Sequence, residues 1–220
     1  MAAEREGPVA GIVLAAGTSS RLGRNKLLLE LGGESVVRHT VRNAIEGGLT
    51  PVLVVLGFEA GQTRDALTGL ACEPVDNPEY ALGINRSLQV GLAAVPPEAV
   101  AAVVLLADMP LVTGAMITAV VRAYRRSAAP LVISQFGEAQ APPTLYDRSL
   151  FGAFREREGE GAGKRVVTRH RQDAVSITFP PGALVDLDRP DDYRRLQAMF
   201  ADNVRDAPNP PTRSGRPRSN

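Results

Sequence analysis

Residues 9–26 read VAGIVLAAGTSSRLGRNK, and this stretch decides the fold. Its first part, Val9–Leu14, is a continuous apolar run of the kind that forms a buried strand. Small residues and a glycine follow, and then hydroxyl side chains and the cations Arg21, Arg24 and Lys26. Backbone amides approach a ligand closely where no bulky side chain intervenes. Together with the cations they form an anion site, so the stretch predicts a site for a nucleoside triphosphate.

Two better-known phosphate loops do not fit these residues. A Walker A loop needs glycine, four residues and then Gly-Lys-Ser/Thr, but the next glycine after Gly17 is Gly23, and an arginine follows it. The dinucleotide fingerprint G-x-G-x-x-G is also missing, because Gly17 lies between Ala16 and Thr18. The remaining alternative is an ordinary strand-to-helix turn with solvated basic side chains.

The rest of the chain alternates between apolar runs and amphipathic stretches. We expect further strands at residues 51–57, 72–75, 102–107 and 131–134, and a short extended piece at 27–31. We expect helices at residues 35–45, 60–67, 84–95, 113–125, 151–158 and 190–200. Buried strands alternating with helices predict an α/β fold with a mostly parallel sheet and helices on both faces.

A carboxylate follows one of these runs directly. Residues 102–107 are apolar, and Asp108, Met109 and Pro110 come next. Ligands of open α/β sheets lie outside the carboxyl ends of the strands, so Asp108 is expected in the same crevice as the residues after Leu14. A carboxylate repels a triphosphate unless a cation lies between them, which predicts Mg²⁺. Alternatively, Asp108 caps the helix expected at 113–125.

The first stretch resembles a known family. Leu14-Ala15-Ala16-Gly17-x-Ser19-x-Arg21-x-Gly23-x-x-Lys26 is similar to the signature loop of MobA-like nucleotidyltransferases, most closely of molybdenum cofactor cytidylyltransferases. The resemblance implies a Rossmann-like nucleotidyltransferase fold over residues 9–201. It implies that Arg21, Lys26 and Asp108 act in catalysis, and that Leu14, Ala15, Ala16, Gly17, Arg21 and Lys26 bind the nucleotide.

Two later stretches extend the resemblance. Asn77-Pro78-x-Tyr80-x-x-Gly83, followed by Ser87, resembles a second family motif that helps to hold the nucleotide, so Asn77, Gly83 and Ser87 are expected at the site. A Pro/Gly turn with a helix cap is the alternative reading. Asp186 and Asp188 alternate with apolar residues, so they are expected on one face of a strand. The family has a metal-binding carboxylate in this segment, which implies that Asp188 completes the metal site with Asp108. Caps and salt bridges alone are the alternative.

The resemblance also suggests the substrates. Family members that use CTP usually carry alanine at the position of Ala16, whereas those that use GTP usually carry glycine there. It implies molybdopterin as the acceptor, and a transient contact with a molybdoenzyme or its chaperone. Pro142-Pro143 stands where many cytidylyltransferases have Gly-His-Pro, so a sugar phosphate, a polyol phosphate or phospholactate remains open. A non-catalytic nucleotide-binding protein that delivers cofactor is the alternative from another class.

Composition limits the remaining possibilities. The 220 residues are 44% hydrophobic and 22% charged, which is ordinary for a globular protein. A net charge of +1 gives no general reason to expect nucleic acid or an anionic membrane as a partner. With neither a secretory signal nor an apolar run near the roughly 18 residues of a membrane span, we expect a cytoplasmic protein. We expect a flexible N-terminus at 1–8 and a proline-rich, disordered tail at 202–220.

Overall fold

The structure, a computed structural model, describes residues 5–18, 24–155, 161–185, 187 and 189–205. Its centre is an eight-stranded sheet with the order β10-β7-β9-β6-β1-β4-β5, in which β8 pairs with β7. The strands are β1 (Val9–Ala15), β4 (Val52–Leu56), β5 (Glu73–Asp76), β6 (Ala101–Leu106), β7 (Leu131–Phe136), β8 (Ala139–Gln140), β9 (Thr144–Asp147) and β10 (Ala174–Phe179). A separate two-stranded ribbon joins β2 (Glu30–Leu31) to β3 (Glu34–Ser35).

The sheet is mostly parallel, which confirms the predicted fold class. β1 lies between β4 and β6 and is parallel to both, and β5 and β10 are parallel to their neighbours β4 and β7. β9 runs against β6 and β7. No strand was predicted at β10, the last strand on one side of the sheet, whose residues alternate between apolar and polar side chains rather than forming a continuous apolar run.

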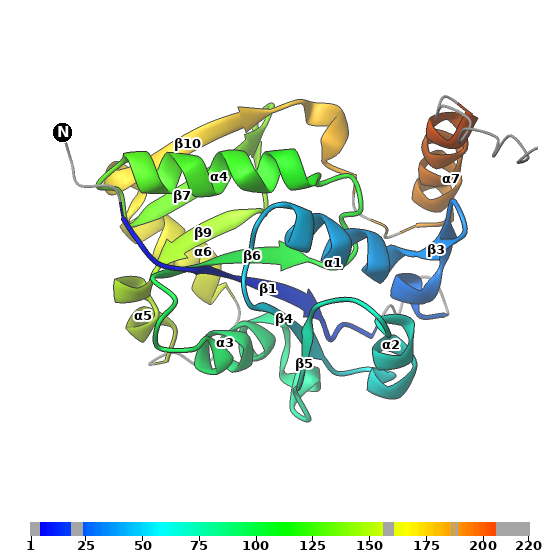
Figure 1. Cartoon of the computed structure of the whole chain (residues 1–220), viewed down its shortest axis with the longest axis horizontal. Helices are drawn as coiled ribbons and strands as arrows, with labels where there is room; N and C mark the ends of the chain where they lie inside the picture. The colour runs from blue at the N-terminus through cyan, green and yellow to red at the C-terminus, as the bar shows by residue number, and fades with distance from the viewer. Residues whose placement is uncertain (1–4, 19–23, 156–160, 186, 188, 206–220) are drawn as a thin grey trace, which may run out of the picture.

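Helices cover both faces of the sheet (Figure 1). α1 (Val36–Glu46) and α4 (Gly114–Arg126) lie on one face, and α3 (Ile84–Ala94), α5 (Gly152–Arg155) and α6 (Ala162–Arg169) lie on the other. Successive side chains of a strand point to opposite faces. Accordingly, Val13 and Ala15 of β1 join the core under α1 and α4, whereas Ile12 and Leu14 join the core under α3.

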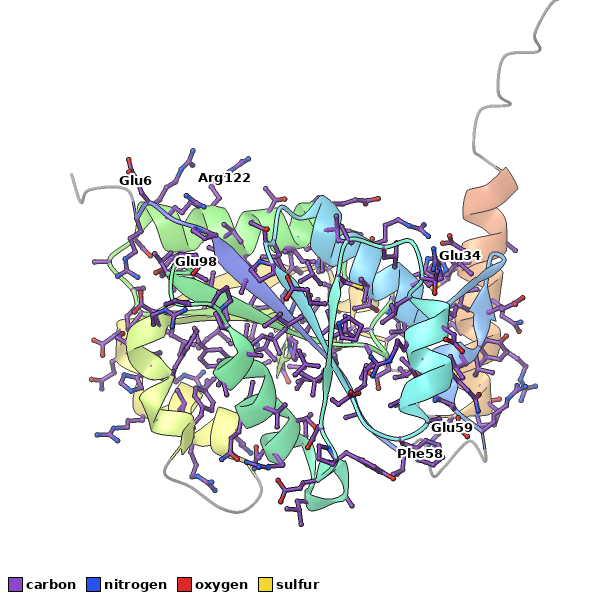
Figure 2. The ribbon with its side chains drawn as sticks, turned by 60° about the horizontal axis from the view of Figure 1, so that its bottom comes forward. Glu6, Glu34, Phe58, Glu59, Glu98 and Arg122 are labelled. Carbon is purple, nitrogen blue, oxygen red and sulfur yellow. The ribbon has the colours of Figure 1, made fainter. Side chains whose placement is uncertain are left out.

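The amino ends of the parallel strands lie on one side of the molecule, which we call the amino edge, and their carboxyl ends lie on the opposite side, the carboxyl edge. Glu6 and Glu98 precede β1 and β6 and lie at one end, while Phe58 and Glu59 follow β4 and lie at the other, next to α2 (Ala60–Ala66) (Figure 2). Ligand sites of such sheets lie at the second of these edges, beyond the carboxyl ends of the strands.

The amino edge is closed by the start of the chain. Arg5 donates to the carbonyl oxygens of Ala128 (2.7 Å) and Ala129 (3.1 Å) and to Asp147 Oδ2 at 3.0 Å. The Tyr124 hydroxyl also donates to Asp147, at 2.6 Å. These bonds tie Arg5 to the segment between α4 and β7 and to β9, and the flexibility expected for residues 1–8 stays a prediction.

Three expected elements differ from the observed ones. The extended piece predicted at 27–31 is confirmed for β2 at residues 30–31, but its first residues lie in a 3₁₀ turn, η1 (Lys26–Leu28). α7 (Pro190–Arg205) continues beyond its predicted end near Phe200. The strand predicted to carry Asp186 and Asp188 is wrong for its described part, because Leu184, Val185 and Leu187 belong to no strand. Leu187 donates its backbone N–H to the carbonyl oxygen of Asp108 instead, at 3.3 Å. Across the described residues, no helix is long and apolar enough to cross a membrane.

Candidate nucleotide site

A pocket of about 330 Å³ opens beyond the carboxyl ends of β1, β5 and β6. Its size lies within the range of about 300–1,000 Å³ that is usual for small-molecule sites. Its lining comes from four parts of the chain: the end of β1, η1, the β5–α3 connection and the end of β6. The lining residues are Leu14, Ala16, Gly17, Thr18, Lys26, Leu27, Tyr80, Ala81, Gly83, Ile84, Ser87, Leu106 and Asp108.

An ion pair forms the charged side of this pocket. Lys26 Nζ donates to Asp108 Oδ2 at 2.5 Å, and each side chain is 16% exposed. The position of Lys26 is set by Asn25, whose side chain caps η1 by accepting from Leu27 N at 3.1 Å. Because the residues that follow β1 and β6 meet at one edge, two side chains 82 positions apart in the sequence are in direct contact.

Asp108 does not cap the helix that follows it. α4 is capped by Thr113, whose hydroxyl oxygen accepts from Met116 N at 3.3 Å. The Asp108 carboxylate points to Lys26 instead. This geometry removes the helix-cap alternative for Asp108 and leaves its carboxylate at the pocket.

The β5–α3 connection forms the uncharged side. Buried Asn77 donates to the Ser87 hydroxyl at 3.0 Å and accepts from Glu79 N at 3.1 Å, which joins the turn to the first part of α3. Gly83 precedes α3 with φ +98°. A β-carbon there would meet nothing within 4 Å, so the backbone conformation, rather than lack of space, favours glycine.

The structure brings most of the predicted residues together. Leu14, Ala16, Gly17, Lys26, Gly83, Ser87 and Asp108 all line the pocket. Ala15 points into the core under α1, and Asn77 lies behind the lining, where it holds Ser87. Arg21 and Asp188 lie outside the described residues.

Several lining residues were not predicted, of which Tyr80 is the largest. Tyr80 stands within the quoted Asn-Pro-x-Tyr motif, so its presence was visible in the sequence. That its side chain faces a ligand pocket depends on the strand order, which the motif alone does not give. The other missed lining residues are Thr18, Leu27, Ala81, Ile84 and Leu106.

The oxygen chemistry at Asp108 fits a divalent cation. Mg²⁺ binds through one or two carboxylates together with phosphate oxygens and water, rather than through a cage made only of protein groups. In the described part of the chain, no cluster of three or more His, Cys, Asp or Glu side chains could hold a metal ion by itself. Asp108 therefore suits a cation that the substrate's phosphates help to bind.

Known proteins share this arrangement of strands and motifs. The model of the MobA-like NTP transferase domain family matches residues 11–175, which include both Lys26 and Asp108. The chain belongs to this family. It is thus a nucleotidyltransferase of the MobA-like type, and the predicted family is confirmed.

Two relatives match this MobA-like transferase over most of their own length. The purine catabolism protein PucB of Bacillus subtilis is 28% identical over 208 residues, covering 87% of this chain and 97% of PucB. A probable molybdenum cofactor guanylyltransferase of Opitutus terrae is 34% identical over 199 residues, covering 88% of this chain and 96% of that protein.

A solved structure agrees with the fold. Rv0371c from Mycobacterium tuberculosis superposes with a TM-score of 0.75 at 29% identity, covering 87% of this chain and 98% of that one. Its complex with manganese superposes with a TM-score of 0.71 at 27% identity.

Proposed function

We propose that this MobA-like transferase moves CMP from CTP to the phosphate of molybdopterin, with release of pyrophosphate. The observation that carries the proposal is the Lys26–Asp108 pair in one pocket with Ala16 and Gly17. This pocket combines a cation, a carboxylate and a glycine at the end of a strand, which are the groups that a metal-bound triphosphate needs.

The reaction requires no nucleophile from the protein. An oxygen of the acceptor phosphate attacks the α-phosphorus of CTP, the new O–P bond forms, and the bond to the β-phosphate oxygen breaks. The electron pair leaves on pyrophosphate. Catalysis of this kind depends on positioning and on neutralising the charge of the phosphates. Gly17 allows close approach to the phosphates, and the Lys26 ammonium neutralises part of their charge.

Asp108 is the described residue that would hold Mg²⁺, together with phosphate oxygens of the substrate. When bound, the ion supplies positive charge to the phosphates. The manganese complex of Rv0371c supports a divalent cation in a protein of similar sequence and fold. Asp188 as a second ligand remains a proposal from the family motif.

The choice of CTP rests on Ala16. Ala16 lines the pocket, and its methyl group would take up space that a larger purine needs. One methyl group changes discrimination by about 1–3 kcal/mol, or roughly 10- to 200-fold. The guanylyltransferase name of the Opitutus terrae relative points to GTP instead. A direct competition between the two nucleotides is therefore the decisive measurement.

The proposal is tested by product analysis with each of the four nucleoside triphosphates and purified molybdopterin. We expect CMP transfer to exceed GMP transfer, and Ala16→Gly to raise the share of GTP used. Pyrophosphate release with a sugar phosphate, a polyol phosphate or phospholactate, and none with molybdopterin, would assign another acceptor. Tight nucleotide binding without turnover on any acceptor would contradict an enzyme and favour a cofactor-delivery protein.

A further inference from the structure

Gly57 marks a point where three neighbouring strands bring their following residues into contact. A β-carbon at Gly57 would lie 2.5 Å from Tyr80 Cβ, 2.7 Å from Tyr80 Cγ and 2.8 Å from Ala16 Cβ. Real β-carbons almost never approach other atoms so closely, and Gly57 has no positive φ that would itself require glycine. The missing side chain therefore creates a notch, in which Tyr80 packs against the strand end next to Ala16.

The strand order places this notch away from the charged pair. Along the carboxyl edge, Asp108 follows β6, Ala16 and Gly17 follow β1, Gly57 follows β4, and Tyr80 comes after β5. Adjacent strands are about 4.8 Å apart, so β6 and β5 are separated by roughly 14 Å. A triphosphate at Lys26 and Asp108 would thus extend its base towards Tyr80.

Tyr80 is held in place by its backbone on both sides. Its N–H donates to the Asn77 carbonyl oxygen at 3.3 Å, and its own carbonyl oxygen accepts from Gly83 N at 3.1 Å. The turn that contains the notch is joined to the β1 loop as well, because Phe58 N donates to the Ala16 carbonyl oxygen at 3.3 Å. Tyr80 lines the pocket and is half-buried.

We propose that Tyr80 is the aromatic wall that contacts the base of the nucleotide, and that Gly57 positions it by providing the notch. The inference rests on the proposed function, because it takes the ligand to be a nucleoside triphosphate whose phosphates lie at Lys26. Stacking of a base on an aromatic side chain contributes about 1–3 kcal/mol, or roughly 5- to 150-fold in affinity. A wall of this kind acts on the base and leaves the phosphate contacts unchanged.

Titration calorimetry of the full chain with Mg²⁺ separates these two parts of the ligand. The ligands are CTP, GTP and inorganic tripolyphosphate, which has no base. We expect Tyr80→Ala to weaken CTP binding by at least fivefold while the affinity for tripolyphosphate stays within about twofold. Tyr80→Phe keeps the ring and should restore the affinity for CTP.

Gly57→Ala tests the notch without removing the ring. The added methyl group displaces Tyr80, so CTP binding should weaken at least fivefold and tripolyphosphate binding should persist. Gly61→Ala is the matched control, because a β-carbon at Gly61 meets nothing within 4 Å. Its affinities should equal those of the wild type.

Equal weakening of CTP and tripolyphosphate by Tyr80→Ala would overturn the inference and indicate a purely structural role. Unchanged CTP affinity in Tyr80→Ala, or no CTP binding by the wild type, would overturn it as well. The proposed function fails separately, if the wild type binds CTP through Tyr80 but forms no nucleotidylated product with any acceptor.

Discussion

Replacing Asp108 with asparagine separates the chemistry of the pocket from the stability of the fold. Asparagine keeps the shape of the side chain and one acceptor oxygen, but it removes the negative charge beside Lys26. The backbone carbonyl oxygen of Asp108, which accepts from Leu187 N, is unaffected by the substitution. Turnover and thermal stability should therefore respond very differently.

The expected effect on stability is small. A hydrogen bond to a charged group contributes about 1.5–3 kcal/mol when its partner cannot be replaced. Here each side chain is 16% exposed at an open pocket, so Lys26 regains water and still has the asparagine oxygen as an acceptor. We expect a loss of about 1 kcal/mol, which lowers Tm by roughly 2–4 °C in a chain of this size.

The expected effect on turnover is large. If Asp108 holds the cation that neutralises the phosphates, its loss removes a main electrostatic contribution, which is worth about 10²- to 10³-fold in kcat. Pyrophosphate release at saturating CTP and Mg²⁺ measures the change, and a thermal scan measures Tm. Asp147→Asn is the matched control. It breaks a partly buried ion pair with Arg5 at the amino ends of the parallel strands, on the opposite side of the molecule from the pocket. It should therefore lower Tm and leave kcat within about twofold.

Full turnover of Asp108→Asn with Mg²⁺ would refute the assignment of the cation to Asp108. A fall in turnover that matches the fraction of unfolded protein would also refute it, because the carboxylate would then act only on the fold.

Two further substitutions, and the pH dependence of Asp147→Asn, test other parts of the structure. Lys26 and a metal ion compete for the Asp108 carboxylate, and Lys26→Met removes this competitor. We expect Mn²⁺ to bind at least about threefold more tightly in the absence of nucleotide, as measured by electron paramagnetic resonance. Weaker binding would contradict the competition. Burial alone would raise the pKa of Asp147, but its hydrogen bonds and the nearby Arg5 guanidinium lower the pKa overall. The ionised Asp147 carboxylate therefore stabilises the fold above its unfolded pKa of about 3.9, and this contribution is lost as the pH falls through the lower folded pKa. Asp147→Asn should accordingly reduce the difference between the free energies of unfolding at pH 6 and pH 3, as measured in urea, and an unchanged difference would exclude this role. Gly91→Ala places a β-carbon 2.5 Å from Ile12 Cγ2. The overpacking cost of about 1–3 kcal/mol should exceed the gain in helix propensity of about 1 kcal/mol, so we expect a lower free energy of unfolding in urea. A stabilised variant would contradict the packing of α3 on β1.

The strands with the clearest signal in the sequence are three that are buried on both faces. β1, β4 and β6 lie at the centre of the sheet under helices, so their sequences are continuous apolar runs. β10 lies at an edge and is only partly buried, and its alternating residues give a weaker signal than a continuous run. The last helix ends at Arg205 rather than near Phe200.

The position of Asp108 at the pocket could be predicted from the rule that ligands bind at the carboxyl ends of parallel strands. The expectation that Asp108 faces the residues after Leu14 required only that both strands be parallel neighbours, and β1 and β6 are adjacent. The direct ion pair between Lys26 and Asp108 could not be predicted, because the sequence does not show that η1, which begins at Lys26, lies beside the end of β6.

The two sides of the pocket differ in how the chain builds them. The uncharged side comes from one contiguous segment, 77–87, whose members hold each other through the bond from Asn77 to Ser87. The charged side joins Lys26 and Asp108, and the Leu187 amide is bound to Asp108 as well, so distant parts of the chain converge there. Substitutions within segment 77–87, such as those at Tyr80, can thus change the recognition of the base without moving Lys26 and Asp108, where the phosphates would bind. On the charged side, a substitution that changes only the side chain of Asp108 keeps the backbone bond from Leu187, so its effects on binding and on folding can still be separated.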